Sequence, residues 1–210
     1  MHNITTDSYP FISVVMPIHN SKDYFKESID SVLSQSFKNF ELIIVDNCST
    51  DGSWELLKEQ YKECKNIKVY RTSHNTGGPA SPRNIGIRKS RGRYIAFIDS
   101  DDIWKENKLL VQIKYLNNYN IVCSEVDKIN DEGATVSVKQ KTKDVIINLC
   151  DLVKKNSIVT STVLLSKEVM LDIMFDEDES LHAFEDYHAY MRILSENNAL
   201  LIGESLAFYR

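Results

Sequence analysis

The sequence has few cysteines and no cysteine pairing pattern. Four occur in 210 residues, far apart and without a CxxC pair. Zinc sites and disulfide frameworks usually need closely spaced thiols, so we expect neither. We expect free thiols, buried or half-buried, in a reducing compartment; they are Cys48, Cys64, Cys123 and Cys150.

Long apolar runs and a secretory leader are also missing. A membrane-spanning helix needs about 20 apolar residues, whereas the longest apolar runs here are of strand length. The N-terminal MHNITTDSYP lacks the basic and apolar segments that mark a signal peptide. We therefore expect a cytoplasmic protein, with peripheral contact to the cytoplasmic face of a membrane left open.

The chain carries no excess of positive charge. It has 25 Lys and Arg against 30 Asp and Glu, for a net charge of −5, so a nucleic-acid partner is not expected. Composition is that of an ordinary globular protein, with 42% hydrophobic residues. Length and the lack of repeats predict a single domain over residues 1–210.

The first hundred residues alternate strand-like and helix-like segments. Apolar runs that end in turns predict buried strands at residues 12–18, 40–46, 67–71 and 94–98. Helical periodicity between them predicts helices in residues 21–37 and 49–64. A third helix is expected after the Gly/Pro loop TSHNTGGPASPRN, from about Arg83 through Ser90. This order predicts an α/β fold, with a mostly parallel sheet and helices on both of its faces.

The pattern is less regular beyond Trp104. We expect helices at residues 104–116, 144–156 and 182–197, and strands near residues 120–126, 161–166 and 199–210. A turn is expected at Gly133. The buried stripe of the last helix is predicted to comprise Phe184, Tyr187, Met191 and Leu194.

Polar clusters follow three of the predicted strands: PIHN, DNCSTDGS and DSDD. Ligands of such sheets bind beyond the carboxyl ends of the strands. Within DSDD, Asp99 and Asp101 project to one side of an extended backbone. A divalent cation such as Mg²⁺ or Mn²⁺ would relieve their mutual repulsion. The alternative is that Asp101 or Asp102 caps the next helix.

The remaining candidates each have a structural alternative. Asp46 and Asn47 could bond a nucleobase or a ribose, or could simply form a turn. Arg83, at a helix start after a loop that is not a P-loop, could reach a diphosphate or lie on the surface. Glu185 and Asp186 lie in the first turn of a predicted helix, where the helix dipole stabilises acidic side chains, and this alone could explain them. Alternatively, Asp186 could accept a proton from a sugar hydroxyl.

Taken together, four segments closely resemble the family 2 glycosyltransferases of the GT-A fold, enzymes of bacterial surface-polysaccharide assembly. These segments are residues 12–53, NTGGPASPRNIGI, GRYIAFIDSDDIW and EDYHAYMRI. The resemblance implies a nucleotide-diphospho-sugar donor, a glycan or lipid-linked acceptor, Mn²⁺ or Mg²⁺, and inversion at the anomeric carbon. It also implies a nucleotide-sugar-binding half at about residues 10–104 and a smaller acceptor-side half at about residues 105–210.

The resemblance assigns roles to individual residues. Asp99-Ser100-Asp101 matches the DxD motif, with Asp101 as direct metal ligand and Asp99 facing the donor as well as the metal. Asp186 matches the catalytic base, which Glu185 would orient. The positions matched to nucleotide-sugar binding are Pro17, His19, Asp46, Asn47, Arg83, Asp99, Ser100 and Asp101.

Two departures from the family pattern affect these expectations. Asn47 stands where the family commonly has a second aspartate, so a UDP-sugar is expected and a thymidine-linked donor is the alternative. Relatives usually continue past the position of Arg210, so the chain is expected to be shortened there. Two other functions fit parts of the pattern: a haloacid-dehalogenase-like phosphatase, from DSDDI, and a non-catalytic nucleotide-sugar-binding module.

Overall fold

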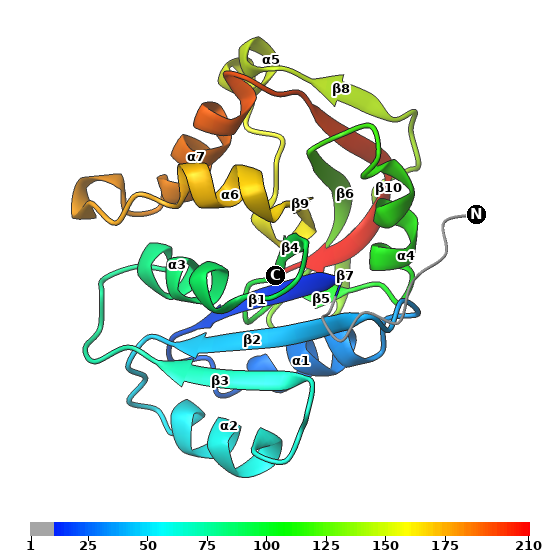
Figure 1. Cartoon of the computed structure of the whole chain (residues 1–210). Coiled ribbons are helices and arrows are strands. Elements are labelled where there is room, and N and C mark those ends of the chain that lie inside the picture. Colours follow the sequence, from blue (N-terminus) through cyan, green and yellow to red (C-terminus); the bar gives the residue numbers. More distant parts are fainter. Residues whose placement is uncertain (1–10) are drawn as a thin grey trace.

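The computed structural model describes residues 11–210, and the first half follows the predicted order of elements (Figure 1). Residues 1–10 lie outside the described part. The absence of a leader pattern and the start of the predicted single domain both concern these residues. Within the described part, no helix is long and apolar enough to cross a membrane.

A ten-stranded sheet forms the centre of the described structure. Its main path runs β3-β2-β1-β4-β9-β6-β10-β5, with β7 paired to β6 and β8 to β10. The strands are β1 (Ile12–Ile18), β2 (Phe40–Asp46), β3 (Ile67–Arg71), β4 (Tyr94–Phe97), β5 (Ile103–Trp104), β6 (Ile121–Ile129), β7 (Thr135–Ser137), β8 (Val145–Ile147), β9 (Leu164–Ser166) and β10 (Ala199–Tyr209).

The parallel part of the sheet matches the prediction. β1 pairs in parallel with β2 on one side and with β4 on the other, and β3 extends the sheet beyond β2. Short antiparallel strands are added in the second half, where β9 pairs with β4 and β6 and β5 pairs with β10. The sheet is therefore mostly parallel, and the carboxyl ends of β1, β2, β3 and β4 open toward one edge.

Helices cover both faces of the sheet, as predicted (Figure 1). One apolar core contains residues of α1, α2 and α4, and the other contains residues of α3, α5, α6 and α7. The helices are α1 (Phe25–Leu33), α2 (Ser53–Tyr61), α3 (Ala80–Lys89), α4 (Lys108–Gln112), α5 (Leu149–Lys154), α6 (Lys167–Ile173) and α7 (Glu185–Leu194).

A glycine lets α3 lie close to the central strand. A Cβ atom placed on Gly86 would meet Cγ1 of Val15 at 2.4 Å, which is far inside van der Waals contact. The missing side chain thus allows α3 to rest directly on β1. This close packing fixes the start of α3, and with it Arg83, relative to the strand ends.

Some predictions for the second half are wrong. The segment after Asp102 forms β5 before the short α4 begins, so Asp102 caps no helix. Residues 144–156 contain β8 as well as α5, and α6 was not predicted. The predicted buried face of α7 is partly wrong. Phe184 was expected to be buried but is 61% exposed, and Tyr190, which was not in the predicted set, is fully buried. Tertiary contacts to the sheet override local periodicity at these places.

Candidate active site

Loops after β1, β2 and β4 meet at the carboxyl edge of the sheet. The hydroxyl groups of Ser21 and Ser100 lie 2.7 Å apart, joining the loop after β1 to the loop after β4. Ser28 of α1 donates to the carbonyl oxygen of Ser100 at 2.9 Å. Residues far apart in the sequence are therefore held in one crevice, as the strand order predicts.

Asp46 is completely buried at the end of β2. Its Oδ2 atom accepts from the backbone N–H of Ser49 at 3.1 Å and lies 3.0 Å from Nε of Arg71. Arg71 in turn donates to the carbonyl oxygen of Ser49 at 2.8 Å. In this structure the carboxylate of Asp46 is occupied in fixing the loop that follows β2 against the end of β3.

Asn47 ties the loop after β3 to the crevice. Its Oδ1 atom accepts from both the backbone N–H and the hydroxyl of Thr76, at 3.1 and 2.9 Å, and from the hydroxyl of Thr72 at 3.2 Å. Its Nδ2 atom donates to Oδ1 of Asn75 and to the carbonyl oxygen of Gly78, at 3.3 and 3.1 Å. An aspartate has no such donor, which explains physically why an amide suits this position.

His19 extends this network toward solvent. Its Nδ1 atom donates to the carbonyl oxygen of Asn47 at 3.0 Å, because a carbonyl can only accept. Nε2 lies 3.3 Å from the side-chain amide of Asn75. His19 is exposed, whereas Pro17 is buried within β1. His19 is therefore available at the crevice surface, and Pro17 supports the strand behind it.

Arg83 links the loop after β4 to the start of α7. Its Nη2 atom lies 2.6 Å from Oδ1 of Asp99, and its Nη1 atom lies 3.0 Å from Oε1 of Glu185. Burial acts to lower the pKa of Arg83, but Asp99 and Glu185 raise it above its ordinary value, so the guanidinium stays charged. With its side chain 4% exposed, Arg83 is not the surface residue of the alternative prediction.

Asp101 has a carboxylate available for a ligand. Among residues 11–210, no other residue donates a hydrogen bond to it, although the group is half-buried. Burial and the neighbouring charge of Asp99 raise its pKa. A bound cation would offset both effects, so the carboxylates present fit a divalent metal. The described residues hold no group of three or more His, Cys, Asp or Glu side chains arranged to bind a metal by themselves.

Asp102 has a structural role beside this loop. Its Oδ1 atom accepts from the backbone N–H of Arg210 at 3.0 Å, and its Oδ2 atom is buried without a partner among the described residues. Burial and the charge of Asp99 raise its pKa to about 7. Asp102 therefore fastens the end of β10 to the loop after β4.

Arg210 continues this fastening with its side chain, which is only 4% exposed. Its guanidinium donates to the backbone carbonyl oxygens of Asp101, Asn130 and Asp131, at 2.9, 2.8 and 2.8 Å. It also pairs with Glu27 of α1 at 2.8 Å. One side chain thus positions the backbone of the 99–102 loop against α1 and the turn after β6.

Asp186 lies in the first turn of α7. Its Oδ2 atom accepts from the hydroxyl of Thr160 at 2.8 Å, and that hydroxyl accepts from the buried phenol of Tyr190 at 3.2 Å. Burial raises the pKa of Tyr190, and the charge of Asp186 adds to this effect. Tyr190 therefore remains a hydrogen-bond donor, and the pair holds one oxygen of Asp186 in place.

Several carboxylates of the site affect the phenol of Tyr209. Burial raises its pKa, and the charges of Asp102, Asp99, Asp101 and Asp186 each raise it further. Tyr209 itself is 43% exposed. Asp186 of α7 and the carboxylates after β4 therefore all lie close enough to the end of β10 for their charges to act on this phenol.

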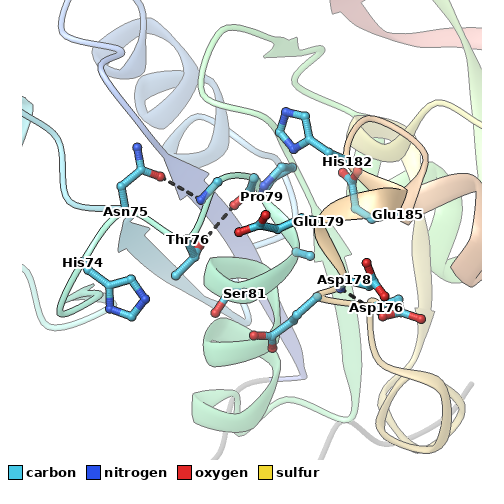
Figure 2. A pocket seen from close by; sticks show the side chains of 14 residues that line it. His74, Asn75, Thr76, Pro79, Ser81, Asp176, Asp178, Glu179, His182 and Glu185 are labelled. Atoms are coloured by element: carbon cyan, nitrogen blue, oxygen red, sulfur yellow. Dashed lines mark hydrogen bonds between the residues drawn. The ribbon is translucent and has the colours of Figure 1, made fainter.

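A cavity of about 790 Å³ is lined in part by Glu185 (Figure 2). One wall is the segment 74–81, which leads into α3, and the other is the segment 176–182 together with Glu185. Figure 2 shows Asp176 and Asp178 on one side of this space and Asn75 and Thr76 on the other, with Glu179 between them. The first wall coincides with the NTGGPASPRNIGI segment of the family resemblance, whereas no sequence motif indicates the wall at residues 176–182.

Several site residues were not found from the sequence. Arg71 was detectable in principle, since it ends β3 at the same edge as Asp46. Thr160, Ser161 and Arg210 lie in segments without a site motif. Ser161 accepts from the backbone N–H of Asp99 at 2.9 Å, a contact that only the folded chain reveals.

Comparison with known proteins gives a consistent match. The family model described as Glycosyl transferase family 2 matches residues 13–172. An uncharacterized glycosyltransferase of Haemophilus influenzae is 33% identical over 187 residues, which are 89% of this chain and 73% of the relative. A putative teichuronic acid biosynthesis glycosyltransferase of Bacillus subtilis, TuaG, is 41% identical over 111 residues, covering 53% of this chain and 44% of that protein.

Among solved structures, the crystal structure of Staphylococcus aureus TarS 1–349 in complex with UDP is similar. Its TM-score is 0.79 at 25% sequence identity, and the match covers 94% of this chain and 60% of that one. The chain thus spans less than two thirds of TarS 1–349 and of TuaG. The predicted GT-A architecture is confirmed by this likeness.

Proposed function

The chain belongs to glycosyl transferase family 2, and from this membership we propose that it transfers a sugar from a nucleotide-diphospho-sugar to a hydroxyl group of a glycan or lipid-linked acceptor in cell-wall polysaccharide synthesis. A UDP-sugar is the expected donor, because TarS of this fold was crystallised with UDP. Family membership decides against the phosphatase alternative. Lipid-linked acceptors would place the reaction at the cytoplasmic face of a membrane.

The observation that carries this proposal is the position of Arg83 between Asp99 and Glu185. It joins the DSD segment, which suits a metal-diphosphate, to the acidic pair, which suits proton abstraction. The first contact comes from the strand-rich half at residues 10–104 and the second from residues 105–210. We propose these as the donor and acceptor halves.

The donor half would hold the nucleotide through the crevice at the strand ends. His19 is exposed for contact with the nucleoside, while Asp46 and Asn47 keep the flanking loops in place. Asp101 and Asp99 would hold Mg²⁺ or Mn²⁺, which supplies charge neutralisation to a leaving diphosphate when bound. Arg83 adds a fixed positive charge near Asp99, although both of its terminal nitrogens are already paired.

The acceptor half would supply the base. Aspartate carboxylates ordinarily ionise with a pKa of about 3.9, so at neutral pH they can accept a hydroxyl proton. Thr160 binds Oδ2 of Asp186, and the backbone N–H of Tyr187 binds Oδ1 at 2.6 Å. Each of these oxygens keeps a second lone pair, which can receive that proton. The hydroxyl oxygen then attacks the anomeric carbon on the face opposite the leaving diphosphate, so the configuration inverts. Glu185, held by Arg83, positions the start of α7.

The test combines donor binding with transfer. UDP with MnCl₂ is expected to raise the melting temperature, and Asp101→Ala to abolish this shift. Asp186→Asn is expected to keep the shift and to lose transfer by roughly 10²-fold or more, the usual range for removing a general base. Absence of a shift with UDP, TDP and GDP would reject the donor site, and an unchanged rate in Asp186→Asn would reject the base.

A further inference from the structure

The 790 Å³ cavity beside Glu185 is rich in carboxylates. Asp176, Glu177, Asp178 and Glu179 line it from the segment that precedes α7. Glu177, Asp178 and Glu179 are exposed. Glu177 lies 3.9 Å from Arg88, and Asp176 lies 3.7 Å from the imidazole of His188. Among the described residues, no Lys or Arg pairs with Asp178 or Glu179, so the cavity carries a negative potential.

The opposite wall supplies hydrogen-bond donors. It contains the first residues of α3, a ten-residue helix whose N-cap, Pro79, makes no side-chain capping bond. The first N–H groups of a helix have no partner within the helix, and their dipole amounts to about half a positive charge. Several ionised carboxylates outweigh that half charge. The cavity thus offers both donors and acceptors but disfavours an anion.

Glu185 adds an independent sign of a ligand. Its side chain is 7% exposed and lines the cavity. Oε1 is paired with Arg83, but Oε2 is buried and has no partner among the described residues. A buried, unpaired carboxylate oxygen is costly, and only a hydrogen-bond donor can satisfy it. A ligand with hydroxyl or ammonium groups would bring such a donor to this wall.

The two walls approach each other at Gly78 and His182. A Cβ atom on Gly78 would lie 2.7 Å from Nδ1 of His182, so the glycine leaves room for the imidazole. His182 and Glu185 both line the cavity (Figure 2). The acidic segment is thereby held near the start of α3.

We propose that this cavity is the acceptor subsite and that it takes an uncharged or amine-bearing sugar while rejecting one with a carboxylate or phosphate group. The inference rests on the proposed function and adds the chemical class of acceptor. Hydroxyl groups both donate and accept, which suits the mixed walls, and an ammonium group gains from the carboxylates. Glu185 connects the bound sugar to Asp186, the neighbouring residue and proposed base.

The test uses three matched probes: methyl β-glucoside, methyl 2-amino-2-deoxy-β-glucoside and methyl β-glucuronide, together with their galacto counterparts. Their binding to the chain is measured by saturation-transfer NMR and titration at pH 6.5, with UDP and MnCl₂ present. The neutral and amino sugars are expected to bind at least tenfold more tightly than the uronides.

A charge-removing variant locates the effect. Asp178→Asn with Glu179→Gln keeps side-chain size and the Oδ1 acceptor that Ser180 N–H uses at 2.8 Å. This double variant is expected to reduce the ratio of the amino-sugar affinity to the uronide affinity by about threefold to tenfold. That size is expected when two exposed charges are removed. The matched control, Glu59→Gln with Glu196→Gln, removes two exposed charges outside the cavity and should change nothing.

Three results would overturn the inference: equal binding of the uronides, binding of none of the glycosides, or a preference that the Asp178 and Glu179 changes leave intact. The UDP-dependent thermal shift is read on the same samples. A retained shift with any of these results rejects the acceptor subsite alone. A lost shift in the unaltered chain rejects the proposed function itself.

Discussion

Arg83 and Glu185 are 102 positions apart in the sequence, yet Nη1 of one lies 3.0 Å from Oε1 of the other in the buried interior of the site. The same guanidinium binds Asp99 through Nη2. Breaking a buried ion pair leaves an uncompensated charge, so the group that joins the two halves of the site also contributes to folding stability.

Replacing Arg83 by lysine tests this link. An ammonium group cannot bridge two carboxylates in the planar geometry of a guanidinium. Arg83→Lys is expected to lower the free energy of unfolding by about 3 kcal/mol or more, the range for a broken buried pair. Urea denaturation measures the change. Arg88→Lys is the control, because that arginine is 54% exposed and lies 3.9 Å from Glu177. Equal stability of both variants would contradict the bridging role.

Asn47→Asp tests the amide at the end of β2. The new carboxylate would face the carbonyl oxygen of Gly78 and lose the donor that now binds it at 3.1 Å. Loss of about 1–3 kcal/mol in unfolding free energy is expected for such a buried mismatch. Thermal and urea unfolding give the value, with Asn198→Asp as an exposed control. A variant as stable as the original would show that Asn47 does not fasten the loop.

Thr160→Val removes the hydroxyl that binds Asp186 at 2.8 Å and keeps the side-chain shape. The base would lose its orientation, so kcat for transfer is expected to fall about tenfold or more, with the KM for the donor little changed. Thr160→Ser retains the hydroxyl and should recover most of the rate. If kcat falls equally in both variants, or in neither, the hydroxyl of Thr160 does not orient the base.

Lys108 gives a prediction on pH. Its side chain is fully buried, with Nζ 2.7 Å from Oε1 of Gln112 and 4.1 Å from the ring centre of Trp104. Burial lowers its pKa well below the ordinary value. Between the folded and unfolded pKa values, the unfolded chain binds the extra proton, so this group makes stability increase with pH.

The measurement compares unfolding free energies of the original chain and Lys108→Met from pH 8 to 9.5, below the ordinary lysine pKa of about 10.4. Their difference is expected to change by up to about 1.4 kcal/mol per pH unit, in favour of the original chain at higher pH. Taking the difference cancels titrating groups that do not interact with Lys108. Cys123 does interact with Lys108, but burial raises its pKa to about 12, so it stays protonated in both folded chains over this pH range. Lys114→Met, at an exposed position, should show no such trend.

The strands of the first half were predictable because each is a short apolar run that must be buried, and turn residues mark its ends. The same local rules predicted the helices at Phe25–Leu33 and Ala80–Lys89. They failed for β5, β8 and α6, since short elements depend on what they pack against. Among the described residues, Cys48, Cys64 and Cys123 are free and buried or half-buried, as predicted, whereas the free Cys150 is exposed, contrary to the prediction.

Local sequence patterns were enough to predict the parallel α/β core and the gathering of His19, Asp46 and Asp99 at one edge, because parallel strands place their carboxyl ends together. The contacts of those side chains came from the folded structure alone. Arg83 is a buried bridge rather than a surface group, Asn47 serves the loop after β3, and Arg210 holds the 99–102 loop. Such pairings join residues whose separation in sequence carries no periodic signal, so they follow only from how the layers of the fold pack together.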